Sequence, residues 1–278
     1  MPCVISTDRM TGPIHITPSG ETLGARITGI DLSQPLDPSS VAQLRQALLE
    51  YCVLVFPNQP VSDEDQVRFT GYFGSARAHV RKQRERRVKE IFIISNVKEN
   101  GEPIGALGSA TVDFHSDLSY MPRPGTISLL QAIEIPQEGG QTQWCDCRAA
   151  HDALPAQEQR MLSTLRAVHR HPVPEQNPPE PASHPVVRIH PETGRPSLYV
   201  SPHLTSHVAN MDEAGSEALL EGLYAHMDQP RFVWTHHWQV GDLLMWDNRP
   251  TMHRRLEFPD EQRRVMKRTQ VFGDEPVE

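Results

Sequence analysis

Three histidines in this sequence are followed, two residues later, by a carboxylate, a spacing that can bring two metal ligands together. The triplets are His115-Ser116-Asp117, His190-Pro191-Glu192 and His226-Met227-Asp228. The chain has 14 histidines and 35 acidic residues, so about two such triplets are expected by chance and the spacing alone identifies no site. The local setting separates them, because residues i and i+2 share a face of a strand but not of a helix.

The triplet at 115–117 has the most favourable setting. His115 and Asp117 follow Phe114 and precede Leu118 and Tyr120, an alternation that predicts a strand with both candidate ligands on one face. The triplet at 190–192 precedes a Thr-Gly turn, where exposed positions are usual, and the triplet at 226–228 ends a predicted helix. We therefore expect His115 and Asp117 to be the metal pair.

A third metal ligand has to come from elsewhere in the chain, and His253 is the best candidate. It follows an apolar segment that ends at Trp246 and a tight Asp-Asn turn, close to the start of another expected strand. Two histidines and one carboxylate hold ferrous iron and leave positions open for oxygen and a chelating cosubstrate. An ordinary packed or surface histidine is the alternative for residue 253.

A strand expected close to the C-terminal end carries two arginines on one face. Arg264, Met266, Arg268 and Gln270 share one parity, and a face that mixes arginine with methionine is unusual for a plain apolar core. Guanidinium groups that face inward need anionic partners, and carboxylates match their planar fork. The alternative is a solvent-exposed strand end.

The elements that must position these residues are many short strands with helices at the periphery. The chain contains 25 prolines, which favour loops over long helices. Strands are expected at 14–32 (as two), 53–56, 91–95, 126–135, 141–146, 186–190, 197–200, 232–238, 242–246 and 265–272. Helices are expected at 39–52 with Ser39 or Ser40 as N-cap, 63–73, 155–168 and 212–227, and 171–185 is a proline-rich excursion. This pattern favours a mainly β fold with peripheral helices around a double-stranded β-helix (jelly-roll) core.

Composition and charge argue against several classes of protein. The formal net charge of −8 disfavours a dedicated nucleic-acid binder, and no apolar segment is long enough to span a membrane. The four cysteines are too few for a disulfide framework and no export signal is visible, so we expect a cytoplasmic protein. Neither a phosphate-binding glycine loop nor a G-x-S-x-G nucleophile motif is present. A basic stretch at 81–89 is either a solvated loop or a lid that attracts an anionic substrate.

The ordered series of motifs resembles the iron(II)- and 2-oxoglutarate-dependent dioxygenases of the taurine dioxygenase and 2,4-dichlorophenoxyacetate dioxygenase family. The matching segments cover nearly the whole chain: ITPSGETLGARITGIDL at 16–32, LVFPNQPVS at 54–62, GGQT at 139–142, HPETGRPSLYV at 190–200 and VGDLLMWDNRPTMHR at 240–254. The segment CDCRAAHDALP looks closer to the herbicide-oxidising branch. The resemblance implies a single dioxygenase domain over 1–278, with helices, strands and a lid at 1–110 and a jelly-roll core at 111–278 that contains an insert at about 148–230.

The resemblance also implies a role for each candidate residue. His115, Asp117 and His253 would ligate Fe(II), and Arg264 would bind the distal carboxylate of 2-oxoglutarate with help from the hydroxyl group of Thr142. Arg268 would pair with the anionic group of the substrate. The implied reaction uses O2 and 2-oxoglutarate to hydroxylate a small anionic substrate, such as an aryloxyalkanoate-like carboxylate or an alkyl sulfonate, with or without cleavage of a C–O or C–heteroatom bond.

Two positions depart from the pattern of the relatives. Thr111, itself a candidate substrate contact, stands where taurine-oxidising relatives have asparagine, which disfavours taurine as the substrate. Gln141 stands where the family often has aspartate. By rough alignment His79, and His203 or His207, are candidate substrate contacts, with ordinary surface histidines as the alternative. The family also implies a homo-oligomer, either a dimer or a tetramer.

Two other functions are compatible with the same residues. A non-redox β-barrel metalloenzyme, either a hydrolase or an isomerase, would use the same three ligands, work without oxygen and have no use for Arg264. A binding module that meets an acidic partner or nucleic acid through the basic stretch would depend strongly on salt and be indifferent to ferrous iron.

Overall fold

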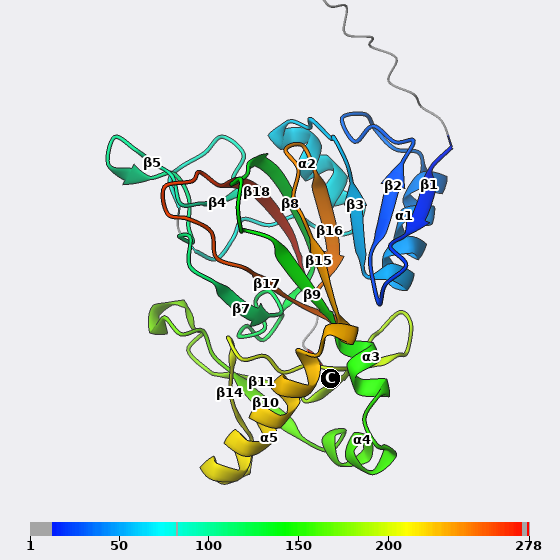
Figure 1. Ribbon diagram of the computed structural model, residues 1–278, viewed down its shortest axis with the longest axis vertical. Coiled ribbons are helices and arrows are strands. Elements are labelled where there is room, and N and C mark those ends of the chain that lie inside the picture. Colours follow the sequence, from blue (N-terminus) through cyan, green and yellow to red (C-terminus); the bar gives the residue numbers. More distant parts are fainter. Residues whose placement is uncertain (1–12, 82, 274–276, 278) are drawn as a thin grey trace, which may run out of the picture.

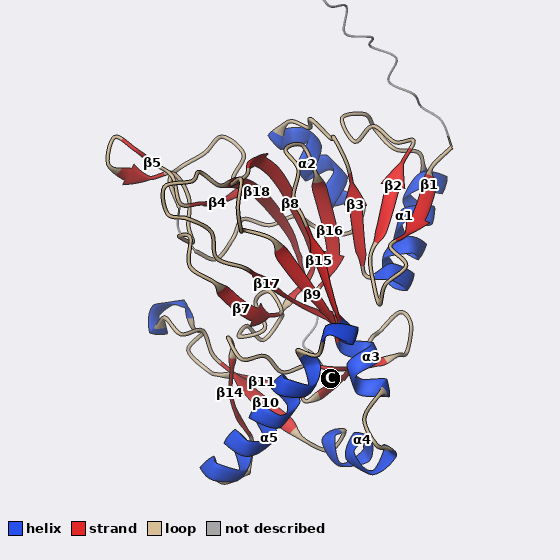
Figure 2. Cartoon of the chain, viewed as in Figure 1, coloured by secondary structure: helices blue, strands red, loops and turns tan. Residues whose placement is uncertain are grey.

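The computed structural model describes residues 13–81, 83–273 and 277, and its fold is mainly β, as expected (Figure 1). Figure 2 shows strands in the upper part of the molecule and most of the helices below and beside them. A seven-stranded sheet has the order β1-β2-β3-β16-β8-β18-β4, and a four-stranded sheet has the order β15-β9-β17-β7. The large sheet contains β1 (His15–Pro18), β2 (Ala25–Thr28), β3 (Val53–Phe56), β4 (Phe92–Ser95), β8 (Gly125–Glu134), β16 (Leu243–Asp247) and β18 (Val265–Phe272). The small sheet contains β7 (Val112–His115), β9 (Thr142–Asp146), β15 (Val233–His236) and β17 (Thr251–Arg255).

Side chains from both sheets form one apolar core between them. Leu130 and Leu244 of the large sheet pack in the same cluster as Trp144 and Trp234 of the small sheet. The rings of Trp144 and Trp246 are almost fully buried, and their centroids lie 5.6 Å apart. The two sheets therefore stack as two layers, and the burial of large aromatic rings between them stabilises the arrangement.

Two helices, α1 (Pro38–Tyr51) and α2 (Asp63–Gly71), pack on the opposite face of the large sheet. Leu48 of α1 and Phe69 of α2 share an apolar cluster with Leu129 of β8. The large sheet is consequently buried on both faces, which explains why its central strands are apolar without alternation.

The start of α1 differs from the expectation. The N-cap is Asp37, whose side chain accepts hydrogen bonds from the backbone N–H groups of Ser39 and Ser40, at 2.9 and 3.0 Å. Pro38 occupies the first turn, where its missing N–H costs nothing. The prediction of Ser39 or Ser40 as the cap was wrong because a carboxylate one turn earlier satisfies the same free N–H groups.

The segment between β9 and β15 forms an insert that packs on the outer face of the small sheet. Its apolar cluster includes Leu220 and Leu223 together with Cys145 of β9 and Met252 of β17. The insert contains α3 (Cys147–Asp152), α4 (Ala156–Leu162), β10 (Arg166–His169), η1 (Pro174–Gln176), β11 (Ala182–Pro185), β12 (Val187–Ile189), β13 (Pro196–Leu198), β14 (Thr205–Val208), α5 (Glu213–Met227) and η2 (Pro230–Phe232). In Figure 1 it occupies the lower part of the molecule. A further hairpin, β5 (Lys98–Glu99) and β6 (Glu102–Pro103), is a separate two-stranded sheet.

The helix expected at 155–168 is shorter than predicted. It ends at Leu162, and the next residues form β10, which pairs with β11 on one side and β14 on the other. Sheet pairing outweighs helix propensity here because Ala167 and His169 alternate with more exposed residues and bury one face of the strand. The proline-rich excursion at 171–185 likewise contains a strand, β11, that closes this sheet.

Pairing within the small sheet brings distant candidate residues together. Strand β17 lies between β9 and β7, so His253 pairs with Trp144 on one side and with His115 on the other. Two residues further along, Arg255 pairs with Thr142. Among the described residues, no helix combines the length and the apolar character that crossing a membrane would require.

Candidate metal centre and its two cavities

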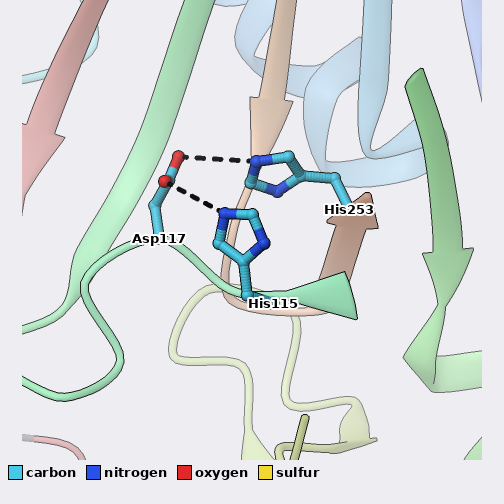
Figure 3. A group of neighbouring side chains, drawn as sticks. All are labelled: His115, Asp117 and His253. Atoms are coloured by element: carbon cyan, nitrogen blue, oxygen red, sulfur yellow. Dashed lines mark ion pairs between the residues drawn. The ribbon is translucent and has the colours of Figure 1, made fainter. Parts of the chain in front are cut away.

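Three residues that the sequence analysis selected as ligands lie together (Figure 3). One donor atom from each of His115, Asp117 and His253 lies within 4.8 Å of the other two. Nε2 of His115 is 3.8 Å from Oδ1 of Asp117, and Nε2 of His253 is 4.0 Å from Oδ2. Within the part of the chain that the structure describes, this is the one such group of histidine, cysteine or acidic residues. We refer to it as the triad.

The chain builds the triad differently from the expected strand. Strand β7 ends at His115, and Asp117 lies in the turn that follows, where Leu118 adopts a left-handed backbone conformation with φ of 60°. The prediction that both residues lie on one strand face was therefore wrong. They converge because the turn points the carboxylate of Asp117 toward the two histidines, which already face each other across β7 and β17.

Burial and neighbouring charges set the protonation of the triad. Burial, reinforced by His253, lowers the pKa of His115 to about 3, and burial lowers the pKa of His253 to about 4. Burial alone would raise the pKa of Asp117, but Arg268 and the two histidines together hold it below its usual value. At neutral pH the triad therefore consists of two uncharged imidazoles and one carboxylate.

This donor set fits a divalent metal ion such as ferrous iron. Nδ1 of His115 donates to the carbonyl oxygen of Asp113 at 2.8 Å, which fixes the tautomer and leaves Nε2 free to coordinate. Oδ2 of Asp117 accepts from Ser128 at 2.7 Å and Oδ1 accepts from Arg268 at 3.1 Å, so the carboxylate is held in place. Three such ligands leave the remaining positions of an octahedral iron open.

One cavity beside the triad is lined mainly by strand residues, and we call it the sheet cavity. Trp246 is among its apolar lining residues, and its polar lining consists of His115, Thr142, His253, Arg255, Arg264 and Arg268. Arg264 is 2% exposed, and its Nε atom has no hydrogen-bond partner among the described residues. Burial, with the charge of Arg255, lowers the pKa of Arg264 to about 9. A desolvated cation of this kind is costly unless an anion compensates it, so the cavity is suited to an anionic ligand.

A second cavity beside the triad is lined mainly by connecting segments, and we call it the loop cavity. Its polar lining consists of His79, Arg81, Tyr120, His171 and His203, together with His115, Asp117 and Arg268. The ring of His203 lies 5.5 Å from that of His115, and the ring of His79 lies 4.2 Å from that of Phe92. Burial lowers the pKa of His203 to about 4, so its ring is neutral at pH 7. Arg81 and Arg268 are therefore the cations of this cavity.

The basic stretch is divided between the loop cavity and solvent. Arg81 is half-buried in the cavity and contacts the imidazole of His171 from the insert. Arg84 is exposed and pairs with Glu99 at 3.3 Å, as a solvated loop would do. Lys82 lies outside the described residues.

Two of the expected substrate contacts do not face either cavity. Thr111 is exposed and precedes β7, and the neighbouring residue Val112 lines both cavities instead. His207 is also exposed, on the opposite side of β14 from Val208, which is buried in the core of the insert. Strand alternation therefore directs His207 to solvent, where it borders a groove beside α5. His79 and His203 do lie in the loop cavity.

The other two His-x-acid triplets have structural partners. His190, expected to be exposed, is 3% exposed, and its Nε2 atom lies 3.0 Å from the carboxylate of Asp247. His226 donates from Nε2 to the carbonyl oxygen of Ala150 at 2.8 Å, and Asp228 pairs with Arg254. Neither triplet contributes to a metal-binding group among the described residues.

Sequence reasoning missed several residues of the cavities. Tyr120 and His171 come from segments without periodicity, so nothing in the sequence marked them. Arg255 carried a usable signal, because residues 253 and 255 share one face of the expected strand. A candidate ligand at 253 therefore implied that Arg255 faces the same site.

Comparison with known proteins gives a consistent result. Residues 15–270 match the family described as "Taurine catabolism dioxygenase TauD, TfdA family". The 2,4-dichlorophenoxyacetate dioxygenase of Cupriavidus pinatubonensis is 34% identical over 96% of this chain and 99% of its own. The (S)-phenoxypropionate/alpha-ketoglutarate dioxygenase of Sphingobium herbicidovorans is 31% identical over 95% of this chain and 97% of its own. The crystal structure of AAD-2 in complex with Mn(II) and N-oxalylglycine superimposes with a TM-score of 0.82 and 32% identity, covering 96% of this chain and all of that one.

Proposed function

The chain belongs to the TauD/TfdA family of non-haem iron, 2-oxoglutarate-dependent dioxygenases, and from this premise we propose that it hydroxylates a small organic anion. The observation that carries the proposal is the position of Arg264, a buried guanidinium without an anionic partner among the described residues, in a cavity that also contains His253. A hydrolase or isomerase that used the same ligands would have no use for that cation.

His115, Asp117 and His253 would hold Fe(II) as its three protein ligands. With 2-oxoglutarate and O2, the bound iron supplies the oxidising power for hydroxylation of a C–H bond, while 2-oxoglutarate is converted to succinate and carbon dioxide. The contribution of the protein is to keep both imidazoles unprotonated, hold the carboxylate through Ser128 and Arg268, and exclude bulk water.

Arg264 and Thr142 would bind the distal carboxylate of 2-oxoglutarate in the sheet cavity. Thr142 is 2% exposed, and its Oγ1 accepts a hydrogen bond from Nε1 of Trp238 at 2.9 Å. This bond orients the hydroxyl group and leaves its own hydrogen available for an acceptor. A carboxylate there would complete the hydrogen bonding of both side chains.

Arg268 and Arg81 would receive the anionic group of the substrate in the loop cavity. A carboxylate such as that of an aryloxyalkanoate fits the planar fork of a guanidinium, and a sulfonate offers similar oxygen acceptors. His79 and His203 line the same cavity as neutral rings and would contact the rest of the substrate. We do not include Thr111 or His207 in this site, because neither lines the cavity.

We also infer that the two stacked sheets are the two halves of a double-stranded β-helix within a single dioxygenase domain. The shared apolar core of β3, β8, β9, β15 and β16 supports this interpretation. A homo-oligomeric state and a cytoplasmic location stay predictions from the sequence.

Anaerobic reconstitution tests the proposed function. Purified protein with Fe(II) and 2-oxoglutarate should develop a weak visible absorption band, and admission of air with a panel of aryloxyalkanoates and alkyl sulfonates should then release succinate. A matched sample with Mn(II) should bind 2-oxoglutarate without turnover. Substrate conversion that proceeds equally well without oxygen and without 2-oxoglutarate would instead support the non-redox metalloenzyme.

A further inference from the structure

Arg255 has no role in the functions assigned so far, yet its side chain lies in the sheet cavity. We propose that Arg255 is a second cosubstrate-binding cation, which shares the distal carboxylate of 2-oxoglutarate with Arg264. The proposal rests on the proposed function, because it assumes that 2-oxoglutarate binds in this cavity.

The position of Arg255 follows from the pairing of the small sheet. It is the last residue of β17, two positions after His253, so both side chains lie on the same face of the strand. Its pairing partner on the neighbouring strand β9 is Thr142. The step from residue 253 to residue 255 is about 6.6 Å along a strand, a length that suits a five-carbon keto diacid with one end at the metal.

The guanidinium of Arg255 is buried and lacks an anionic partner. The residue is 7% exposed, and Nε has no hydrogen-bond partner among the described residues. Nη2 donates to the carbonyl oxygen of Ala110, and the group lies 5.3 Å from the centroid of the Phe258 ring. Neither contact supplies a negative charge, so the cation is desolvated without compensation.

Arg255 and Arg264 together make the charge of the cavity unusual. Each has an unsatisfied Nε, and within the described chain neither forms an ion pair with a carboxylate. Arg268, the third arginine of the cavity, differs because it pairs with Asp117 and also lines the loop cavity, where its unpartnered Nε is available to the substrate. Two neighbouring cations repel each other in a low-dielectric site, and one carboxylate with four lone-pair positions can satisfy both.

A purely structural role is the competing explanation. The hydrogen bond to Ala110 ties the segment before β7 to the end of β17, so Arg255 would then stabilise the fold without touching the cosubstrate. The two roles make different predictions, because a structural tie affects thermal stability and leaves the affinity for a carboxylate unchanged.

The test measures ligand binding by calorimetry on Mn(II)-loaded protein without oxygen. The ligands are 2-oxoglutarate and 2-oxopentanoate, which keeps the keto acid end and the five-carbon chain but has a methyl group in place of the distal carboxylate. Arg255→Gln should lower the affinity for 2-oxoglutarate about tenfold or more, as expected for loss of one charged partner. It should change the affinity for 2-oxopentanoate much less. Arg255→Lys, which keeps the charge, should give an intermediate loss and serves if the glutamine variant does not fold.

The control variant is Arg254→Gln. Arg254 is the adjacent residue of β17, but it pairs with Asp228 at 2.9 Å outside both cavities, so both affinities should match the wild type. The proposal is overturned if Arg255 variants retain wild-type affinity for 2-oxoglutarate, or if they lose both ligands to the same extent. If the wild-type protein itself binds no 2-oxoglutarate, the proposed function fails rather than the role of Arg255.

Discussion

The sheet cavity and the loop cavity meet at the triad but are built from different parts of the chain. The sheet cavity takes its polar side chains from β7, β9, β17, β18 and the residue just before β18. The loop cavity takes most of its polar side chains from the segments around residues 79–81, 120, 171 and 203, outside the two stacked sheets. Strands hold side chains in fixed positions, whereas connecting segments can change without disturbing the sheets. We therefore propose that the sheet cavity holds the cosubstrate and that the loop cavity selects the substrate.

The largest expected effect comes from a change that damages both cavities at once. Asp117→Ala removes the carboxylate that faces both histidines, so the two neutral imidazoles alone should hold the metal weakly. Loss of a residue that only supports a metal ligand typically lowers metal affinity or activity roughly 10–100-fold. Because Asp117 is itself a proposed ligand, we expect larger losses of both Mn(II) affinity and turnover. Metal titration followed by fluorescence or calorimetry checks this. Asp228→Asn, which removes a carboxylate on the surface, is the control, and wild-type metal affinity in Asp117→Ala would refute the assignment of the triad.

The next largest effect is expected from a substitution confined to the sheet cavity. Arg264→Ala removes the buried cation that we propose as the partner of the distal carboxylate, and loss of such a charged contact costs about 2–5 kcal/mol. We expect the KM for 2-oxoglutarate to rise about 100-fold or more, with a smaller change in the affinity for the substrate. Arg263→Ala is a matched control, because that arginine pairs with Glu134 at the surface. Equal kinetics in Arg264→Ala and wild type would break the distinction between the two cavities.

A change confined to the loop cavity should have the opposite selectivity and a smaller size. Arg81→Gln removes a half-buried cation, so the KM for the anionic substrate should rise about 3–10-fold, as for a partly solvated charged contact. The affinity for 2-oxoglutarate, measured in the absence of substrate, should stay unchanged. Arg84→Gln, from the solvated part of the same stretch, should leave both constants unchanged. If Arg81→Gln lowered the affinity for 2-oxoglutarate instead, the two cavities would not be functionally separate.

The last prediction concerns acid stability and is measured as a melting temperature rather than as a ligand affinity. Burial lowers the pKa of His169 to about 3 and that of His184 to about 4, and both belong to the insert that supplies part of the loop cavity. In the unfolded chain these imidazoles bind a proton with a pKa near 6.5. Their contribution to the free energy of unfolding is therefore complete above that pH and is lost as the pH falls toward 4. The loss is on the order of 2 kcal/mol per histidine at pH 5.

Thermal unfolding of metal-free protein at pH 7.5 and pH 5 measures this effect. His169→Gln should reduce the difference between the two melting temperatures, whereas the exposed His207→Gln should leave it unchanged. An unchanged difference between the two melting temperatures in His169→Gln would refute the contribution of this buried ring.

The parts of the fold that sequence reasoning predicts well are those with strong local patterns. The strands at 53–56 and 265–272 have the predicted bounds, because apolar runs flanked by Pro, Asn or Gly have few alternatives. The segment 166–169 was misassigned because four alternating residues also fit the end of a helix, and only the distant partners β11 and β14 decide between them.

The candidate site was predictable to the extent that it follows family motifs. His115, Asp117 and His253 were selected correctly as neighbours, but the supposed strand through Asp117 is a turn with Leu118 in the left-handed conformation. An alternating pattern of apolar and polar residues does not reveal that turn. Tyr120 and His171 reach the loop cavity through tertiary packing alone, so no local pattern could have identified them.

The topology has a consequence for how the protein is synthesised. Strand β8, in the interior of the large sheet, pairs with β16 and β18, which follow it by more than 100 residues. Until the last strands leave the ribosome, β8 lacks both neighbours, and the nascent chain has one imidazole and the carboxylate of the triad without the other imidazole. Folding that depends on such distant pairings is slow. The complete triad therefore cannot bind a metal ion before β17 has been synthesised, so the metal does not nucleate the pairing of the earlier strands.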